Sequence, residues 1–485
     1  MTRGKRSWAS NFVLSGRKEP FAKRRGLHLA GLTSLLILFL NCFLMLGCGG
    51  GSSPPTTPGS PVSTEIPAAS TRTWVTQFGT GTVPPGGLPG DLMSAIVSSP
   101  DGGVFAAGYT LGTFLGMSGS SIHTAEPYIA KFDASGQQQW VQQFFTGAGD
   151  FISDATGDSS GNVFLCGSTL GAFPGFTNSS GIPQALIVKY DPIGRQVWVQ
   201  QFAIGGQVTN IVAAAVSPSG QLFVAGDLIS PSTGVLEDLF VAAVDGATGS
   251  LLWQQTFGTN ASNSVDAIAV DGNGGLFLSG ASSGPFPGSN SQDVQPFVIK
   301  LATADGHLVW TQSFPDLRTT SHLVLSSIAI APDSNLIVGG AKSIDYVVAG
   351  LGAYPNASAL LLKLSSDSGN ILWQQSYSSG TGDQIASVRT LGDGTIYAAG
   401  STNGVLAKNF RQPNQDMFLL KCDASGSPQW VQQFGTGPVS GIIRFGVRLA
   451  VNGNDVFVGG ATQGVYPGAS NPLNAVEAFV AKFGR

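Results

Sequence analysis

The sequence predicts an all-β protein: a seven-bladed β-propeller with four antiparallel strands per blade, closed by pairing the N-terminal strand with three C-terminal strands. Three observations predict it. Tryptophans recur every 55 to 66 residues, each repeat unit contains four strand-like runs, and the chain starts on a fourth strand and ends on a third. Self-similarity at such a period marks a repeat architecture. The recurring tryptophans are Trp74, Trp140, Trp198, Trp253, Trp310, Trp373 and Trp430.

Each unit follows the same order of runs. An Ala/Ser/Ile/Val run such as SAIVSS (94–99) comes first, followed by a tight turn and a run such as NVFLCG (162–167). A third run such as LIVKYD (186–191) leads through a glycine turn into the tryptophan run, WVQQF at 198–202. The second and third runs each occur seven times, and four short strands per unit are typical of a propeller blade.

The two ends of the repeat region complement each other. Trp74 opens a fourth strand that has no third strand before it, and Phe483 closes a third strand that has no fourth after it. Pairing these ends completes a seventh blade and removes the exposed sheet edges of an open array.

The residue types fit the wedge shape of a blade. Small Ala and Ser in the first strands suit a crowded axis, and Trp and Phe in the fourth strands fill the space where blades diverge. The tryptophans could form a stacked binding platform, but packing between blades is the favoured interpretation. The Asp-x-x-Gly turns are interpreted as turn chemistry rather than calcium sites, because none has the full calcium-loop pattern.

Residues 1–47 are predicted to be an export signal. Eight basic residues and one acid precede an apolar run, 27–46, that ends at Gly47-Cys48. The segment Leu44-Met45-Leu46-Gly47-Cys48 resembles the lipobox of bacterial lipoproteins, which implies lipid attachment at Cys48. An uncleaved signal anchor is the alternative, because about 20 apolar residues can span a bilayer.

The chain divides into three segments. After the export signal, residues 48–72 combine the lipid attachment site with a Gly/Ser/Pro tether that cannot bury a core. Residues 73–485 form the propeller. This order predicts a domain held to a membrane by a lipid anchor in the bacterial cell envelope, outside the cytoplasm.

Composition argues against a nucleic-acid partner and against a disulfide bond. Without the leader, 16 basic and 27 acidic residues remain, a net charge near −11, which argues against nucleic acid as a partner. Beyond Cys48, only Cys166 and Cys422 remain, in non-adjacent units, and both are expected to be small buried residues without a disulfide.

The repeat resembles a known bacterial family. Its pattern, Ala-Ile-Ala-Val-Asp-x-x-Gly-x-Val-Phe-x-x-Gly followed by Phe-Val-x-Lys-x-Asp-x-x-Gly-x-x-x-Trp, is similar to the SBBP family of β-propeller repeats over about residues 73–485. That family supplies no shared catalytic residues. A second resemblance is to quinoprotein-type repeats, carried by Val244 to Gly249 before Trp253. It implies an envelope-assembly lipoprotein of quinoprotein-like fold as an alternative.

The longest connections predict where a ligand binds. The second-to-third and fourth-to-first connections are long and emerge on one end of the disc, whereas the other turns are short, and loops on a rigid scaffold commonly carry function. The aromatic residues of these connections are the candidate ligand face. The favoured alternative is that each ring packs onto its own blade. These residues are Phe114, Phe173, Phe286, Tyr346, Tyr354, Phe410 and Tyr466.

The sequence offers no catalytic constellation, no metal-ligand spacing and no cofactor motif. We therefore expect a non-catalytic binding or scaffold module that is anchored to the membrane and binds an envelope protein or a glycan through its long-loop face. The competing hypothesis is a propeller enzyme, a lyase or a quinone-dependent oxidoreductase. It requires acids or histidines from several blades to converge at the channel mouth.

Overall fold

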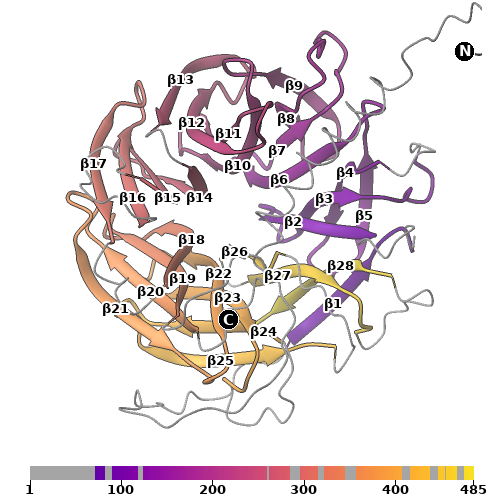
Figure 1. Ribbon diagram of the computed structural model, residues 1–485. Helices are drawn as coiled ribbons and strands as arrows, with labels where there is room; N and C mark the ends of the chain where they lie inside the picture. Colours follow the sequence, from indigo (N-terminus) through magenta and orange to yellow (C-terminus); the bar gives the residue numbers. More distant parts are fainter. Residues whose placement is uncertain are drawn as a thin grey trace, which may run out of the picture. The chain divides into compact units, whose positions relative to one another are not determined.

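Seven four-stranded antiparallel sheets surround a central axis, as predicted (Figure 1). The computed structural model describes residues 72–81, 90–117, 124–258, 262–284, 295–314, 322–343, 357–406, 416–436, 446–453, 455–466 and 475–484. The predicted export signal (1–47), Cys48 and the tether up to residue 71 lie outside these residues.

Blades 1 to 6 each use four consecutive strands, ordered outward from the axis. Blade 1 is β2 (Asp91–Ser98), β3 (Val104–Thr110), β4 (Glu126–Phe132) and β5 (Gln138–Gln143); blade 2 is β6 (Asp150–Gly157), β7 (Val163–Thr169), β8 (Gln184–Tyr190) and β9 (Gln196–Phe202); blade 3 is β10 (Val208–Val216), β11 (Leu222–Ile229), β12 (Leu236–Val244) and β13 (Leu251–Gly258). Blade 4 is β14 (Asn263–Val270), β15 (Gly275–Ser282), β16 (Gln295–Ala302) and β17 (Leu308–Ser313); blade 5 is β18 (His322–Ile330), β19 (Leu336–Ser343), β20 (Ser358–Leu364) and β21 (Ile371–Tyr377); blade 6 is β22 (Asp383–Thr390), β23 (Ile396–Thr402), β24 (Asp416–Cys422) and β25 (Pro428–Phe434).

Blade 7 joins the two ends of the repeat region. Its strands are β26 (Arg448–Asn452), β27 (Asp455–Thr462), β28 (Glu477–Phe483) and, outermost, β1 (Arg72–Phe78). The strands β1 and β28 pair antiparallel, with Arg72 opposite Phe483 and Phe78 opposite Ala478. The ring closure expected from the sequence is therefore confirmed.

The first strand of each blade lies nearest the axis and contacts the first strands of both neighbouring blades, so the ring order follows the sequence (Figure 1). In blades 1 to 6 this strand has a register irregularity opposite a glycine of the second strand, as between Met93 and Ala95. A Cβ added at Gly108 would lie 1.9 Å from the carbonyl oxygen of Leu92. The glycine that ends each second run therefore allows the two backbones to approach.

A row of side chains crosses the outer three strands of a blade. In blade 1, Phe105 lies opposite Lys131, and Lys131 lies opposite Trp140. The Lys131 ammonium lies 5.3 Å from the centroid of the Phe105 ring, and the Trp140 ring lies 5.9 Å from that ring. Blades 2, 4, 6 and 7 repeat the lysine-over-aromatic contact. A desolvated cation over an aromatic face contributes about 1–2 kcal/mol.

The tryptophans pack between blades. The indole N–H of Trp198 donates to the carbonyl of Gly246 in blade 3, and that of Trp310 donates to the carbonyl of Ser366 in blade 5. Phe144, directly after the fourth strand of blade 1, likewise contacts Phe173 and Tyr190 of blade 2. These aromatics fill the space between diverging blades, as the favoured interpretation requires.

Candidate functional site

The long loops on one face are held by a glutamine near the end of the fourth strand, an arrangement we call the glutamine clamp. In blade 2, the Gln201 amide donates to the carbonyl of Gly171 at 2.9 Å and to the Gln184 side chain at 2.8 Å. Its own oxygen accepts the backbone N–H of Phe173 at 3.1 Å. One side chain therefore fixes both sides of the loop between the second and third strands.

The same clamp recurs in three other blades. Each glutamine donates to a loop carbonyl and to the residue that starts or adjoins the third strand, and accepts from a loop N–H. The clamp residues are Gln77 in blade 7, Gln143 in blade 1, Gln201 in blade 2 and Gln433 in blade 6. Blades 6, 7, 1 and 2 are consecutive around the ring, and we call them the clamped arc.

Blades 3, 4 and 5 replace this glutamine by a shorter residue. By strand register the equivalent positions are Thr256, Ser313 and Ser376. None of these side chains can span the loop as a glutamine amide does. We call these three blades the open arc.

A buried aspartate strengthens the clamped arc. Asp150, at the start of the first strand of blade 2, accepts the backbone N–H of Thr146 at 2.8 Å and the hydroxyl of Thr169. Asp91 in blade 1 and Asp383 in blade 6 make corresponding bonds. Burial raises the pKa of Asp150 to about 6, against hydrogen bonds that lower it. Each aspartate ties the connection from the preceding blade to its own first two strands.

Three of the candidate loop aromatics are buried. Phe114 is 6% exposed, Phe173 is 6% exposed and Tyr466 is 1% exposed. Phe114 contacts Tyr128, and Tyr466 contacts Phe479, each within its own blade. These three rings do not form an exposed rim, because the clamp pulls the backbone at or near each ring onto the blade. The other candidates, Phe286, Tyr346, Tyr354 and Phe410, lie outside the described residues.

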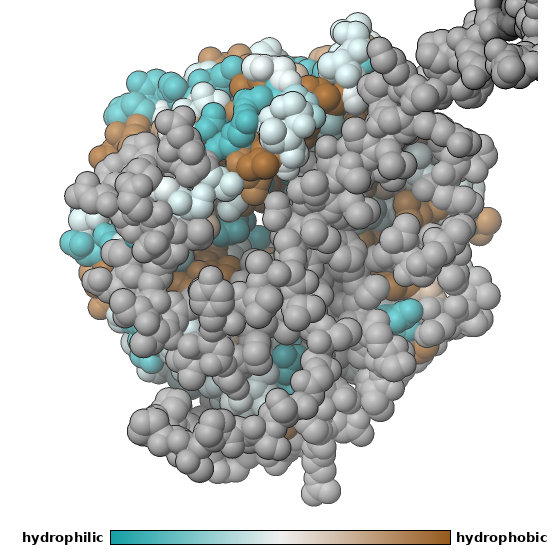
Figure 2. Space-filling model, in the orientation of Figure 1, coloured by the Kyte–Doolittle hydropathy of each residue, from teal (hydrophilic) through white to brown (hydrophobic). Residues whose placement is uncertain are grey.

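Exposed apolar side chains do occur on described loops of this face. Leu115, in blade 1, is 99% exposed, and Val235, in blade 3, is 50% exposed. Along the upper edge of Figure 2, over blades 2 and 3, hydrophilic and hydrophobic described residues are mixed. This edge therefore carries separate apolar side chains among polar ones.

Charged side chains from five blades converge on the central channel, an arrangement that sequence analysis did not find. Four of them stand on innermost strands, and Asp227 stands on the second strand of blade 3. All five are only partly exposed. They are Asp154 (blade 2), Asp227 (blade 3), Asp266 (blade 4), Arg389 (blade 6) and Arg448 (blade 7). The only signal in the sequence is a charge at positions where other units have mostly small or apolar residues.

The channel has two electrostatically different sides. In a seven-membered ring, blade 7 lies across from blades 3 and 4, so Arg448 stands opposite Asp227 and Asp266 (Figure 1). Burial raises the pKa of Asp227 to about 7, and burial together with the Asp227 charge raises the pKa of Asp266 to about 7. Burial also raises the pKa of Asp154, against the attraction of Arg448. The channel therefore holds acids able to exchange protons near neutral pH.

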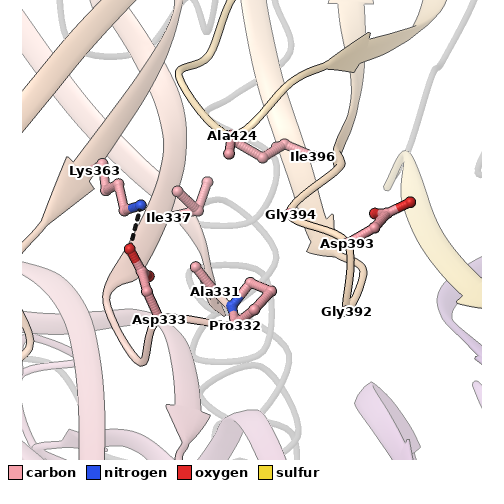
Figure 3. A pocket seen from close by; sticks show the side chains of 10 residues that line it. All are labelled: Ala331, Pro332, Asp333, Ile337, Lys363, Gly392, Asp393, Gly394, Ile396 and Ala424. Atoms are coloured by element: carbon pink, nitrogen blue, oxygen red, sulfur yellow. Dashed lines mark hydrogen bonds and ion pairs between the residues drawn. The ribbon is translucent and has the colours of Figure 1, made fainter.

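Two cavities open beside the short turns. A cavity of about 420 Å³ lies at the channel end between blades 7, 1 and 2, and Arg389 reaches it from blade 6. A smaller one of about 220 Å³ separates blades 5 and 6, where Lys363 pairs with Asp333 at 2.6 Å (Figure 3). Ala424 faces this second cavity, whereas the equivalent Pro192 packs against Gly161 in blade 2.

The described residues include no group of three or more His, Cys, Asp and Glu side chains that could hold a metal ion. Cys166 and Cys422 are buried free thiols, as expected. Among the described residues there is also no helix long and apolar enough to cross a membrane.

Comparison with known proteins identifies a related family over part of the chain. Residues 183–421, or 239 of 485, match the family model described as outer membrane protein assembly factor BamB. The matched stretch contains the whole of blades 3 to 5. No curated protein matches the sequence. Together with the seven sheets of the structure, the match supports a β-propeller repeat protein.

Solved structures similar to the chain share only its fold. U3-55K is 11% identical, over 86% of this chain and 99% of that one, with a TM-score of 0.48. The quinohemoprotein alcohol dehydrogenase from Comamonas testosteroni is 13% identical, over 85% and 76%, with a TM-score of 0.43. The β-propeller domain of the Trilobed protease from Pyrococcus furiosus is 7% identical, over 77% and 90%, with a TM-score of 0.42. At these identities and scores they carry no argument about function.

Proposed function

We propose that this chain is a non-catalytic, lipid-anchored scaffold of the bacterial cell envelope, built from SBBP-type repeats, that binds an envelope protein on the long-loop face of its open arc. The observation that carries the proposal is the family match, which spans all three blades of that arc and whose description names an outer membrane protein assembly factor. The lipobox-like segment ending at Cys48 supports the same location.

The geometry of the loops favours the open arc as the binding surface. In the clamped arc, glutamine and aspartate side chains already hold the loop backbone groups and the described aromatics. In the open arc, Thr256, Ser313 and Ser376 take the place of the clamp glutamine by strand register, and Val235 on the described loop of blade 3 is 50% exposed. A rigid ring that presents loops of different build on one face suits a scaffold.

Site-specific photocrosslinking tests the binding surface. A photoreactive phenylalanine analogue at Val235, in blade 3, should crosslink to an envelope protein in intact cells. The same analogue at Leu115, in blade 1, is the matched control because both are exposed apolar loop residues. Crosslinks from position 115 alone, or from neither position, would contradict the proposal, and retention by purified cell-wall glycan would favour a glycan ligand instead.

Membrane attachment has its own test. The Cys48→Ser variant should move from the membrane fraction to the soluble extracytoplasmic fraction. Unchanged membrane association would contradict lipid attachment and favour an uncleaved anchor.

A propeller enzyme is the second candidate, because burial raises the pKa values of Asp154, Asp227 and Asp266, which come from three different blades. Its test is activity on polyuronides, for a lyase, and dye reduction with an added quinone cofactor, for an oxidoreductase. Activity that is lost in Asp154→Asn would support an enzyme, and no activity in either assay would remove it.

A further inference from the structure

Two arginines stand on neighbouring innermost strands, at positions where other blades carry mostly small or apolar residues. Arg448 on β26 occupies the position of Ala95 and Ala213 in the strand register. Arg389 on β22 occupies the position of Val97 in blade 1. Arg389 lines the cavity between blades 7, 1 and 2, and Arg448 reaches across to the carbonyl of Ser94 on β2.

Most of their hydrogen-bonding capacity is unused within the described residues. Arg448 Nε donates to the carbonyl of Ser94 at 2.7 Å, with a longer bond of 3.4 Å from Nη1 to Val447. Arg389 Nη1 donates to the carbonyl of Val388 at 2.8 Å. A guanidinium carries five N–H donors, so several donors remain on each group.

No carboxylate of the described residues lies within ion-pair distance, 4.0 Å, of either guanidinium. The nearest electrostatic partner is Asp154, whose charge acts on both arginines. Its oxygens already accept the backbone N–H groups of Ala214 and Ala155, each at 2.9 Å. Asp154 is thus held against the channel wall by blades 2 and 3 and does not close onto the arginines.

Two like charges in a confined channel are unfavourable without a closer anion. Burial lowers the pKa of Arg389, and the charge of Arg448 lowers it further, against the opposing effect of Asp154. An uncompensated buried charge destabilises a fold, whereas a bound anion with charge-assisted hydrogen bonds offsets that cost.

The adjoining cavity has the size and lining for a small ligand. Its volume is about 420 Å³, within the usual range of small-molecule sites, and Arg389 is its basic side chain. Ser98, Thr156 and Asn452 line it together with apolar residues of β2, β6 and β26. Asp158, the acid in this lining, lies 3.8 Å from Lys189 and bonds to Asn162. The Ser98 hydroxyl already donates to the carbonyl of Val451, and the Asn452 amide donates to that of Ser99. The cavity therefore presents Arg389, which has no ion pair among the described residues, beside the Thr156 hydroxyl and the second N–H of the Asn452 amide.

We propose that the short-turn end of the central channel is a binding site for a small molecule that carries a carboxylate or phosphate group, with Arg389 as its anchor and the nearby charge of Arg448 as a second attraction. The site lies at the end of the channel opposite the long loops and is independent of the scaffold surface proposed above.

Calorimetry and thermal unfolding of the purified propeller test the site with two probes, inorganic phosphate and succinate. At least one probe should bind saturably and raise Tm. Arg389→Gln should weaken that binding about tenfold or more, because a charge-assisted hydrogen bond is lost. Arg448→Gln should weaken it by a smaller factor, because only a nearby positive charge is lost. Arg195→Gln, which removes an exposed arginine from a turn of blade 2, should bind as the wild type does.

Stability without a probe separates a binding defect from misfolding. Arg389→Gln removes a charge that is unfavourable to bury, so its Tm without a probe should equal or exceed that of the wild type. Binding of phosphate alone identifies a phosphate site, and binding of succinate alone identifies a carboxylate site. Two results would overturn the proposal whatever the outcome of the crosslinking. One is failure of both probes to bind the wild type, and the other is wild-type affinity in both Arg389→Gln and Arg448→Gln.

Discussion

Trp253 of blade 3 lies directly against Gly306 of blade 4. A Cβ added at Gly306 would stand 2.5 Å from the indole ring, and Gly306 has a φ of 75°. The Trp253 N–H donates to the carbonyl of Thr303 in the same turn at 3.0 Å. The indole and the turn therefore fix the spacing between the two blades, and the glycine is required both for its backbone conformation and for its lack of a side chain.

We expect Gly306→Ala to lower the free energy of unfolding by about 2 kcal/mol, because it combines a left-handed backbone with a steric clash. Gly392→Ala is the matched control: a Cβ at Gly392 would meet no atom within 4 Å, and its φ is not positive. Urea denaturation of both variants checks this. Equal stability of the two would show that the blades shift apart without cost.

Loss of a glutamine clamp should release one loop and leave the fold intact. In Gln201→Ala, the amide of Phe173 loses its acceptor, so its hydrogen exchange should accelerate about tenfold or more. Thr256→Ala, at the equivalent position of blade 3, should leave exchange in its own loop unchanged. Hydrogen exchange followed by mass spectrometry on residues 171–176 and 230–235 measures both, and unchanged exchange in Gln201→Ala would mean that the loop is held by packing alone.

Asp266→Asn should stabilise the protein increasingly as pH rises. The pKa of Asp266 is raised from its ordinary value of 3.8 to about 7 in the folded state, so the wild-type fold loses stability as pH rises from about 4 through 7. The asparagine variant does not titrate and avoids that loss. Its advantage in unfolding free energy should be near zero at pH 4 and on the order of 2 kcal/mol at pH 8.

Denaturation curves at pH 4, 6 and 8 test this expectation. An advantage independent of pH would show that the carboxyl acts through packing and not through its charge. Asp305→Asn should show the opposite pH dependence. Hydrogen bonds from His307 lower the pKa of Asp305 on an exposed turn, so the charged carboxylate stabilises the fold above its ordinary pKa and the variant loses that contribution there.

Removal of residues 72–78 should lower Tm and expose β28 as an open edge. Self-association on size-exclusion chromatography should follow, because an unpaired strand edge is a template for pairing. A synthetic peptide of sequence RTWVTQF, supplied in excess, should restore part of the lost Tm. No effect of the deletion on either measurement would contradict a structural role for the closing strand.

The fold was predictable because its signals are local and repeated. The Trp74 and Phe483 strands completed one blade by counting alone, and the small residues of the first strands indicated the axis. The clamp was harder to foresee. The WVQQF run shows two glutamines, but only the strand register reveals that Gln201 faces the loop and that Thr256 takes its place in blade 3.

The channel charges were not predictable for a different reason. Asp154 and Arg389 are 235 residues apart in the sequence and share no motif, and only ring closure brings their blades to opposite sides of one axis. A charged residue at a position where other units carry mostly small or apolar residues is the one trace they leave, and without the ring that trace resembles a surface position.

The pairing of β1 with β28 also determines when the molecule can finish folding. Arg72 is synthesised 411 residues before its partner Phe483, so the first strand made must wait, unpaired, for the last. Blades 1 to 6 can form early because each pairs strands that are close together in the sequence. The contact between β1 and β28 has the largest loop-closure cost among the described strand pairs, because it joins the residues that are farthest apart. During that interval β1 is an unpaired strand edge, and so is β27 once it has been made, because both pair with β28. A cell that makes this protein must therefore protect a nearly complete propeller until its final strand arrives, and chaperone demand should be greatest late in synthesis.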